Sequence, residues 1–159
     1  MIASEIPQKN LKGTYILICL LEKDQSLQIG SLGQTYLKKG IYAYVGSAFG
    51  PGGILARICR HVRRSKRIKW HIDYLTSLKD CFILGFFLFI NNKIECSIAE
   101  MLEEEKCETP IIKFGSTDCK CKTHLFKVKD INQIQQILSR HKIPFSYLQI
   151  DDIKRLCNF

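Results

Sequence analysis

A run of basic side chains is the clearest chemical signal in the sequence. From Arg57 to Lys69 the chain has seven Arg or Lys residues and one histidine, and no acidic residue. Uniform positive charge destabilises a folded chain by repulsion, so a polyanion such as nucleic acid is the natural partner. Guanidinium groups also bind phosphate oxygens through two donors at once, which a lysine does not. The segment indicates a phosphate-binding surface, with an ordinary solvated face as the alternative.

These basic residues are expected to lie largely on a helix over Gly53–Lys66. At about 100° per residue the apolar residues share one broad face, formed by Ile54, Leu55, Ile58, Cys59 and Val62. Arg57, His61 and Arg64 are four and three residues apart, so they are expected to cluster on another side. The candidate DNA-binding residues of this surface are Arg60, Arg63, Arg64, Arg67 and Lys69.

The eight cysteines raise the question of metals and disulfides. Half of them lie in apolar stretches, where a free cysteine behaves as a small hydrophobe: Cys19, Cys59, Cys81 and Cys96. Mostly reduced thiols are therefore expected, as in an intracellular protein. Only Cys119, Cys121 and His124 have a spacing that suits a metal, and a closed zinc site needs four ligands. Cys107 is a candidate fourth ligand that no spacing requires, so zinc is the less favoured interpretation of this segment.

Length and composition describe one globular domain. The chain has 159 residues, 46% of them hydrophobic and 25% charged, with a net charge of +9. The longest apolar run, Cys81–Ile90, is shorter than the roughly 20 residues of a membrane span. The N-terminal residues show no basic region followed by an apolar core, so no secretory signal is expected. A cytoplasmic protein with no membrane partner is the expectation.

The elements that position these side chains alternate between apolar strands and helices. Strands are expected at Gly13–Leu21, Leu27–Gly30, Gly40–Ser47, Cys81–Ile90 and Leu125–Lys129. Helices are expected at Gly53–Lys66, Trp70–Leu78, Ile94–Lys106, Ile131–His141 and Asp151–Leu156. Residues 109–124 read as irregular. This order of elements predicts an α+β fold.

Several motifs, taken in order, resemble the GIY-YIG nuclease superfamily. The chain has GTY at Gly13–Tyr15, YVG at Tyr44–Gly46, an arginine on the next helix and an acid on the helix after the next strand. A closer similarity to an uncharacterised prokaryotic branch of the superfamily rests on YVGSAFGPGG, ARICRHVRRSKRIKWHIDYL, the Glu95–Cys96 pair and FGSTDCKCKTHLF. In that branch the domain stands alone or is joined to a DNA-repair glycosylase.

The resemblance implies a fold and a domain arrangement. The superfamily has a small three-stranded antiparallel sheet flanked by helices. Residues 13–128 would form this nuclease domain after an N-terminal tail at residues 1–12. Residues 129–159 would form a short helical appendage packed on the same domain.

The resemblance also implies a metal-dependent endonuclease that cuts DNA in repair, recombination or restriction. Tyr15 and Tyr44 match the two motif tyrosines, one of which activates the attacking water while the other holds the phosphate. Arg57 matches the arginine that neutralises the scissile phosphate, and His61 matches a position close to the nucleophile. Glu95 matches the acid that binds a single Mg²⁺ or Mn²⁺ ion. DNA is favoured over RNA as the partner, with a possible functional link to a DNA-repair glycosylase.

Some positions depart from the pattern or leave a choice open. The long interval between Tyr15 and Tyr44 implies an extended hairpin, and Ser47 replaces a lysine of several relatives. Glu95 and Glu100 lie five residues apart and hence on different helix faces, so only one can be the metal ligand. Glu95 is preferred because the Glu-Cys pair belongs to the closer match.

Two further expectations concern the loop and the function class. Ser116–Asp118 is expected to fold back near the active site, where relatives place a polar residue. A catalytically inactive, basic nucleic-acid-binding module of the same fold is the alternative to an enzyme. A zinc-binding interaction module built on DCKCKTH is a third possibility.

Overall fold

Three apolar strands form the centre of a five-stranded antiparallel sheet. In the computed structural model, which describes residues 9–159, β1 (Gly13–Leu21) pairs with β4 (Gly40–Ala48) on one side and with β5 (Cys81–Ile90) on the other. The bounds of β1 and β5 are those expected from the sequence. Of the expected N-terminal tail, residues 1–8 lie outside the described residues.

The sheet is wider than the expected three strands. Its order is β6-β4-β1-β5-β7, because β6 (Leu125–Val128) pairs with β4 and β7 (Ser146–Gln149) pairs with β5. The α+β class is confirmed, and the three-stranded count is wrong. The strand β7 was missed because it has only four residues and a half-polar sequence, SYLQ. The C-terminal part is therefore not purely helical.

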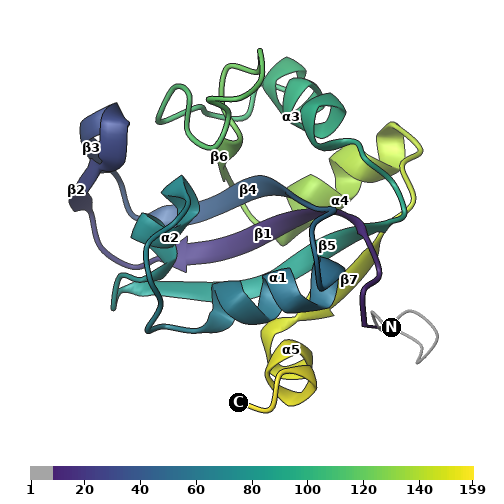
Figure 1. Cartoon of the computed structure of the whole chain (residues 1–159). Coiled ribbons are helices and arrows are strands. Elements are labelled where there is room, and N and C mark those ends of the chain that lie inside the picture. Colours follow the sequence, from purple (N-terminus) through teal and green to yellow (C-terminus); the bar gives the residue numbers. More distant parts are fainter. Residues whose placement is uncertain (1–8) are drawn as a thin grey trace.

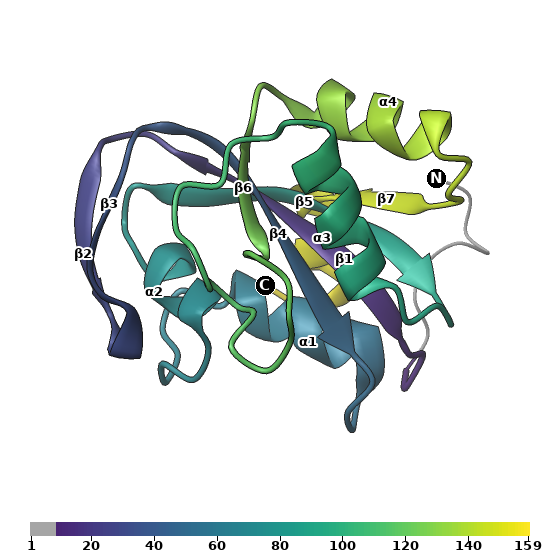
Figure 2. The same cartoon turned by 90° about the horizontal axis from the view of Figure 1, so that it is seen from above.

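Helices cover both faces of the sheet (Figures 1 and 2). One face carries α1 (Gly53–Val62), α2 (His71–Thr76) and α5 (Ile150–Leu156), and the other carries α3 (Glu95–Glu104) and α4 (Ile131–Arg140). Neighbouring residues of a strand point to opposite faces, so the sheet separates two cores. Tyr15 and Tyr44 belong to the core under α1, and Ile16 and Val45 belong to the core under α3. Burial on both faces along most of their length explains why β1 and β5 are almost entirely apolar.

A two-stranded hairpin fills the long interval between the motif tyrosines. It consists of β2 (Gln25–Ile29) and β3 (Gly33–Leu37), joined by the short 3-10 helix η2 (Gly30–Leu32). Both views show the hairpin projecting from one end of the sheet (Figures 1 and 2). The sequence predicted an extended hairpin here but only its first strand, because β3 alternates polar and apolar residues over a short stretch.

The basic segment is only partly helical. The helix α1 ends at Val62, because Arg63 adopts an extended backbone with φ of −65° and ψ of 124°. Residues 63–70 then run without regular structure to α2. Four residues of the expected helix thus belong to this connecting segment, and Arg63, Arg64 and Arg67 are not held in helical register with Arg57.

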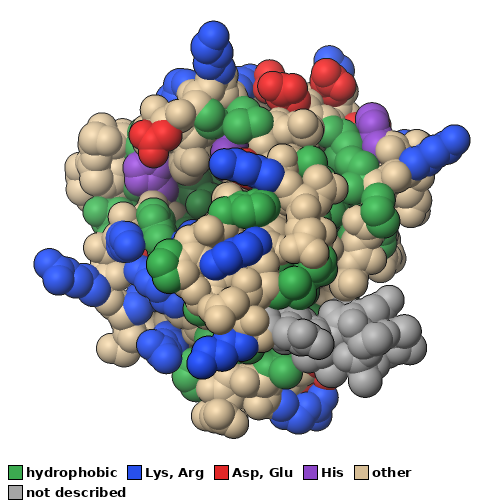
Figure 3. Space-filling model, turned by 45° about the vertical axis from the view of Figure 1, so that its right-hand side comes forward, with side chains coloured by type: hydrophobic (Ala, Val, Ile, Leu, Met, Phe, Trp, Pro, Cys, Tyr) green, Lys and Arg blue, Asp and Glu red, His purple; other side chains and the backbone are tan. Residues whose placement is uncertain are grey.

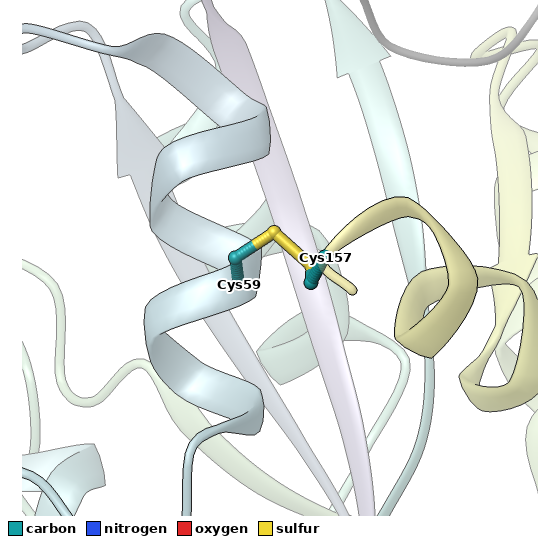
Figure 4. Close-up of a disulfide and its surroundings, with 2 residues drawn as sticks. All are labelled: Cys59 and Cys157. Carbon is teal, nitrogen blue, oxygen red and sulfur yellow. A yellow bond between two sulfur atoms is a disulfide. The ribbon is translucent and has the colours of Figure 1, made fainter. Parts of the chain in front are cut away.

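A disulfide joins α1 to the C-terminal end of the chain. Cys59 is bonded to Cys157, with the two Cα atoms 5.6 Å apart (Figure 4). The expectation that Cys59 is a free hydrophobic side chain is therefore wrong. The cause is tertiary, since α5 packs beside α1 and brings together residues 98 positions apart in the sequence. The other six cysteines are free thiols.

Candidate functional site

Two strand tyrosines and one helix histidine form a buried group beneath α1. The Tyr15 hydroxyl lies 2.7 Å from Nε2 of His61, and the rings of Tyr15 and Tyr44 have centroids 6.4 Å apart. His61 is only 1% exposed. Sequence analysis placed His61 on the basic side of the helix, and that placement is wrong. Position 61 follows Ile54 by seven residues, so it shares the buried face of α1.

Burial keeps this group uncharged. It lowers the pKa of His61 to about 3, an effect that the nearby Lys66 ammonium reinforces. Burial also raises the pKa of Tyr15 well above its usual value, and the nearby Tyr44 acts in the same direction. Among the residues that the structure describes, His61 Nδ1 has no hydrogen-bond partner. Tyr15 and His61 are thus a neutral hydrogen-bonded pair at neutral pH.

The pairing register explains the glycine of the YVG motif. Gly46 on β4 lies directly opposite Tyr15 on β1. A Cβ atom at position 46 would overlap the Tyr15 ring, whose Cε2 would be 2.7 Å away. Only a residue without a side chain leaves room for Tyr15 to reach His61.

Tyr44 is the motif tyrosine that reaches solvent. It is 8% exposed and lines a cavity at the end of β4. Burial raises the pKa of Tyr44 to about 12, although the Arg57 guanidinium opposes this change. The phenol is therefore protonated at neutral pH, so it can donate a hydrogen bond into the cavity.

Arg57 lies across the cavity mouth on α1. Its Nη1 donates to the carbonyl oxygen of Ser47 at 2.9 Å, and its guanidinium carbon lies 4.3 Å from the centre of the Trp70 ring. These two contacts fix the side chain before any ligand binds. The Ser47 backbone, rather than its side chain, is what holds the arginine.

The cavity has a volume of about 300 Å³ and combines one cation with acidic and aromatic groups. It opens where β6 stops pairing with β4 after Tyr44, and the loop before β6 crosses this edge, where Val45 donates to the His124 carbonyl at 2.9 Å. Its polar and aromatic lining includes Tyr44, Ser47, Arg57, Trp70, Glu95, Asp118, Cys119 and His124. Of the expected Ser116–Asp118 segment, Asp118 reaches the cavity, whereas Ser116 is buried.

The carboxylate of Glu95 faces this cavity from the first residue of α3. Its Oε2 is buried and has no hydrogen-bond partner among the described residues. Glu100 is exposed on a different part of α3, where it lines a separate hollow with Glu103 and Glu104. The structure thus brings Glu95, and not Glu100, to Tyr44 and Arg57. A buried carboxylate oxygen without a donor is suited to a hard cation such as Mg²⁺.

The candidate DNA-binding arginines differ in availability. Asp73 accepts two hydrogen bonds from Arg60, at 2.9 and 2.8 Å, so this arginine is occupied within the fold. Arg64 donates to the Leu78 carbonyl at 2.6 Å, although it is exposed. The side chains of Arg63, Arg67 and Lys69 are exposed as well.

A cluster of potential metal ligands adjoins the cavity. The ligand atoms of Cys96, Cys119, Cys121 and His124 all lie within 4.8 Å of one another, so this group could hold a metal ion. The fourth member is Cys96 rather than Cys107, whose sulfur lies 3.9 Å from the Gln133 amide nitrogen. Cys96 was expected to be a free, small hydrophobic side chain. It is a free thiol that packs against the core under α3, and its sulfur also belongs to this cluster.

Comparison with known families identifies the domain. The family model described as "Domain of unknown function DUF123" matches residues 14–144. The chain belongs to the DUF123 family. No curated protein and no solved structure matches it.

The DUF123 match spans the whole candidate site. It includes Tyr15, Glu95 and the four residues of the metal-ligand cluster, and it ends just before β7. The similarity to GIY-YIG nucleases is not part of this match and stays a prediction. Among the described residues, sequence reasoning missed Cys96 as a potential metal ligand and Trp70 as the ring that holds Arg57 at the cavity. The position of Cys96 beside Glu95, at the start of the helix, was the available signal.

Proposed function

We propose that this DUF123 protein is a divalent-metal-dependent nuclease that hydrolyses phosphodiester bonds in DNA. The observation that carries the proposal is the single cavity that unites Tyr44, Arg57 and the unpaired carboxylate oxygen of Glu95. Phosphodiester hydrolysis needs positive charge on the phosphoryl oxygens, hydrogen bonds that orient the reacting groups, and a positioned water. The cavity offers groups for each of these tasks.

Glu95 is the residue that would hold Mg²⁺ or Mn²⁺, with Asp118 on the same cavity wall. When bound, such an ion supplies positive charge to the phosphate and lowers the pKa of a coordinated water. The buried Oε2 of Glu95 supports this assignment, because an unpaired carboxylate oxygen is costly unless a cation or donor meets it.

Arg57 neutralises the phosphate from the opposite side. Its guanidinium is held by the Ser47 carbonyl and the Trp70 ring, so little side-chain freedom is lost when the substrate binds. Its charge is expected to matter most as negative charge builds on the phosphoryl oxygens during attack.

Tyr44 acts as a hydrogen-bond donor to a phosphate oxygen. A pKa near 12 keeps its proton in place at neutral pH, which suits a donor better than a base. Tyr15 and His61 lie behind it in the core and are positioning residues. Their hydrogen bond fixes β1 against α1, and thereby the places of Tyr44 and Arg57.

DNA would enter along the basic segment. A hollow of about 660 Å³ is lined by residues of this segment from Arg60 to Lys69, and the exposed Arg63 and Arg67 are among them. Basic side chains are spread over much of the face in Figure 3 and are most numerous at its left and lower part, where few acidic groups are visible. Such a surface suits the DNA backbone. We place this activity in repair, recombination or restriction, and we propose a functional link to a DNA-repair glycosylase.

The test is cleavage of linear, supercoiled and branched DNA with Mg²⁺, with Mn²⁺ and with EDTA. The wild type should cut at least one substrate with a divalent ion and none with EDTA. Arg57→Ala should reduce cleavage far more than it reduces DNA binding. The control Arg140→Ala, on α4 beside Glu105, should change neither cleavage nor DNA binding. Binding of all substrates without any cleavage would replace this proposal with the inactive binding module.

A further inference from the structure

The Cys96–Cys119–Cys121–His124 cluster has no role in the nuclease chemistry proposed above. We infer that these four residues bind one zinc ion, which fastens the start of α3 to the loop that precedes β6. This inference does not depend on the nuclease proposal, since it concerns other side chains and a different metal.

The type and number of ligands favour zinc. Three cysteine sulfurs and one imidazole form a Cys₃His set, which fills the four tetrahedral positions of a structural zinc site and leaves none open. Soft thiolates select zinc over Mg²⁺ or Mn²⁺, which prefer oxygen ligands. The carboxylate of Glu95 is thus suited to Mg²⁺ or Mn²⁺, and the thiolate of its neighbour Cys96 is suited to zinc.

The distances are close to those of a tetrahedral site. Zinc–sulfur bonds of about 2.3 Å and zinc–nitrogen bonds of about 2.0–2.1 Å place neighbouring ligand atoms roughly 3.5–3.8 Å apart. Cys119 Sγ lies 3.6 Å from His124 Nε2, within that range. No pair of ligand atoms is more than 4.8 Å apart, so small side-chain movements of about 1 Å would complete the tetrahedron.

The surroundings suit a negatively charged metal centre. Three thiolates and one neutral imidazole around Zn²⁺ carry a net charge of about −1. The Lys113 ammonium donates to the carbonyl oxygens of Cys119 and Cys121, at 3.3 and 3.4 Å, and so places a positive charge beside the cluster. Cys121 and His124 are buried, and the cavity lined by Cys96, Cys119 and His124 gives a metal ion an entry path to the cluster.

A disulfide within the cluster is the competing arrangement. It would use two of the three sulfurs and would leave both the third thiol and His124 without a role. The convergence of all four side chains on one point therefore favours a metal. The chain does contain a disulfide elsewhere, at Cys59–Cys157, so the experiment must separate the two outcomes.

The ion would act on the neighbouring cavity through the backbone. Cys96 follows Glu95 in the first turn of α3, and the loop from Cys119 to His124 is hydrogen-bonded to β4 through Val45. Zinc would therefore tie α3, the loop and β4 together at the cavity wall. In this arrangement the four ligands position Glu95 at the cavity wall.

The experiment measures zinc directly in the purified full-length protein. The wild type, purified without chelator, should contain one zinc per chain by elemental analysis. Replacement of zinc by Co²⁺ should give the absorption bands of tetrahedral cobalt and of sulfur-to-cobalt charge transfer. Cys121→Ala should lose both the zinc and the charge-transfer band, whereas the matched control Cys107→Ala and the cavity variant Glu95→Gln should keep them.

Alkylation of the wild type keeps the inference testable if a cysteine variant fails to fold. Peptide mass analysis should find Cys96, Cys119 and Cys121 protected until a chelator is added, and alkylated afterwards. A protein without zinc that takes up none when zinc is supplied would overturn the inference. So would a disulfide between any two of these cysteines, or loss of zinc in Glu95→Gln, which would show that the site is not closed by the four proposed ligands.

Discussion

Gly46 of β4 lies opposite Tyr15 of β1, and the Tyr15 ring occupies the space that a side chain at position 46 would need. The hydroxyl of the same tyrosine is bonded to His61 on α1. The absence of a side chain at position 46 is thus necessary for the hydrogen bond between Tyr15 of the sheet and His61 of α1. This packing explains the glycine of the YVG motif, whatever activity the protein has.

Gly46→Ala should therefore displace Tyr15 and weaken its bond to His61. Overpacking of this kind costs about 1–3 kcal/mol of unfolding free energy. Urea unfolding measures that loss, and DNA cleavage should fall with it. Ser47→Ala is the control, because only the backbone carbonyl of Ser47 holds Arg57. Equal stability of the two variants would contradict the packing argument.

The stability of the protein should fall as the pH is lowered from about 6.5. Burial lowers the pKa of His61 from 6.5 to about 3 in the folded state, so between these values only the unfolded chain binds the proton. The stability contribution is complete above pH 6.5 and is lost progressively towards pH 3. The slope approaches about 1.4 kcal/mol per pH unit for one such group.

Urea unfolding between pH 5 and 8 tests this dependence. His61→Gln removes one titrating group and should reduce the slope in this range. Burial also lowers the pKa of His71 and His124, so part of the slope should remain. His141→Gln is the control, because it removes an exposed histidine instead of the buried one. A His61→Gln variant with the slope of the wild type would assign the acid sensitivity to other groups.

The exposed part of the basic segment should dominate DNA binding. Replacing Arg63, Arg67 and Lys69 with alanine should weaken binding to all sequences and reduce the slope of log affinity against log salt. Each lost phosphate contact removes about 0.9 from that slope on duplex DNA. Arg60 is left intact here because its bond to Asp73 serves the fold.

The control for this triple variant removes the same charge from elsewhere. Lys129, Lys142 and Lys154 are exposed and lie outside the basic segment. Their replacement by alanine should change the salt slope much less. Identical slopes for both triple variants would show that net charge, rather than this surface, drives binding.

The local spacing of apolar residues was sufficient to predict most helices and strands, but it did not predict the contacts between distant segments. The strands around Tyr15 and Tyr44 and the helix that carries Arg57 follow from long apolar runs and from helical spacing. The strand β7, the Cys59–Cys157 disulfide and the place of Cys96 in the cluster depend on segments that meet only after folding. The periodicity of apolar residues within one segment does not show which other segments it will contact in the folded chain.

The same distinction explains the mixed outcome at the candidate site. Helical spacing put Glu95 and Glu100 on different faces of α3, and the structure decides which face meets the cavity. Helical spacing also placed His61 near Arg57, but whether His61 is buried depends on which residues pack against that side of α1. The rings of Tyr15 and Phe86 on the strands turn that side of α1 into core.

Glu95→Gln tests the proposed metal ligand without depending on activity alone. In the wild type, Mg²⁺ or Mn²⁺ should raise the melting temperature, because an ion that binds only the folded state stabilises it by about 2.7 kcal/mol at a hundred times its dissociation constant. Glu95→Gln keeps the size of the side chain but removes its charge. It should abolish this shift and all cleavage while DNA binding persists.

Glu100→Gln is the matched control on the same helix. Glu100 is exposed and faces a different hollow, so its variant should stay within about 0.5 kcal/mol of the wild type and retain the metal-dependent shift and cleavage. If Glu100→Gln were inactive and Glu95→Gln active, the ion would bind on the other face of α3. If neither variant changed cleavage or the metal-dependent shift, the ligand would lie elsewhere, and the unpaired oxygen of Glu95 would have no part in metal binding.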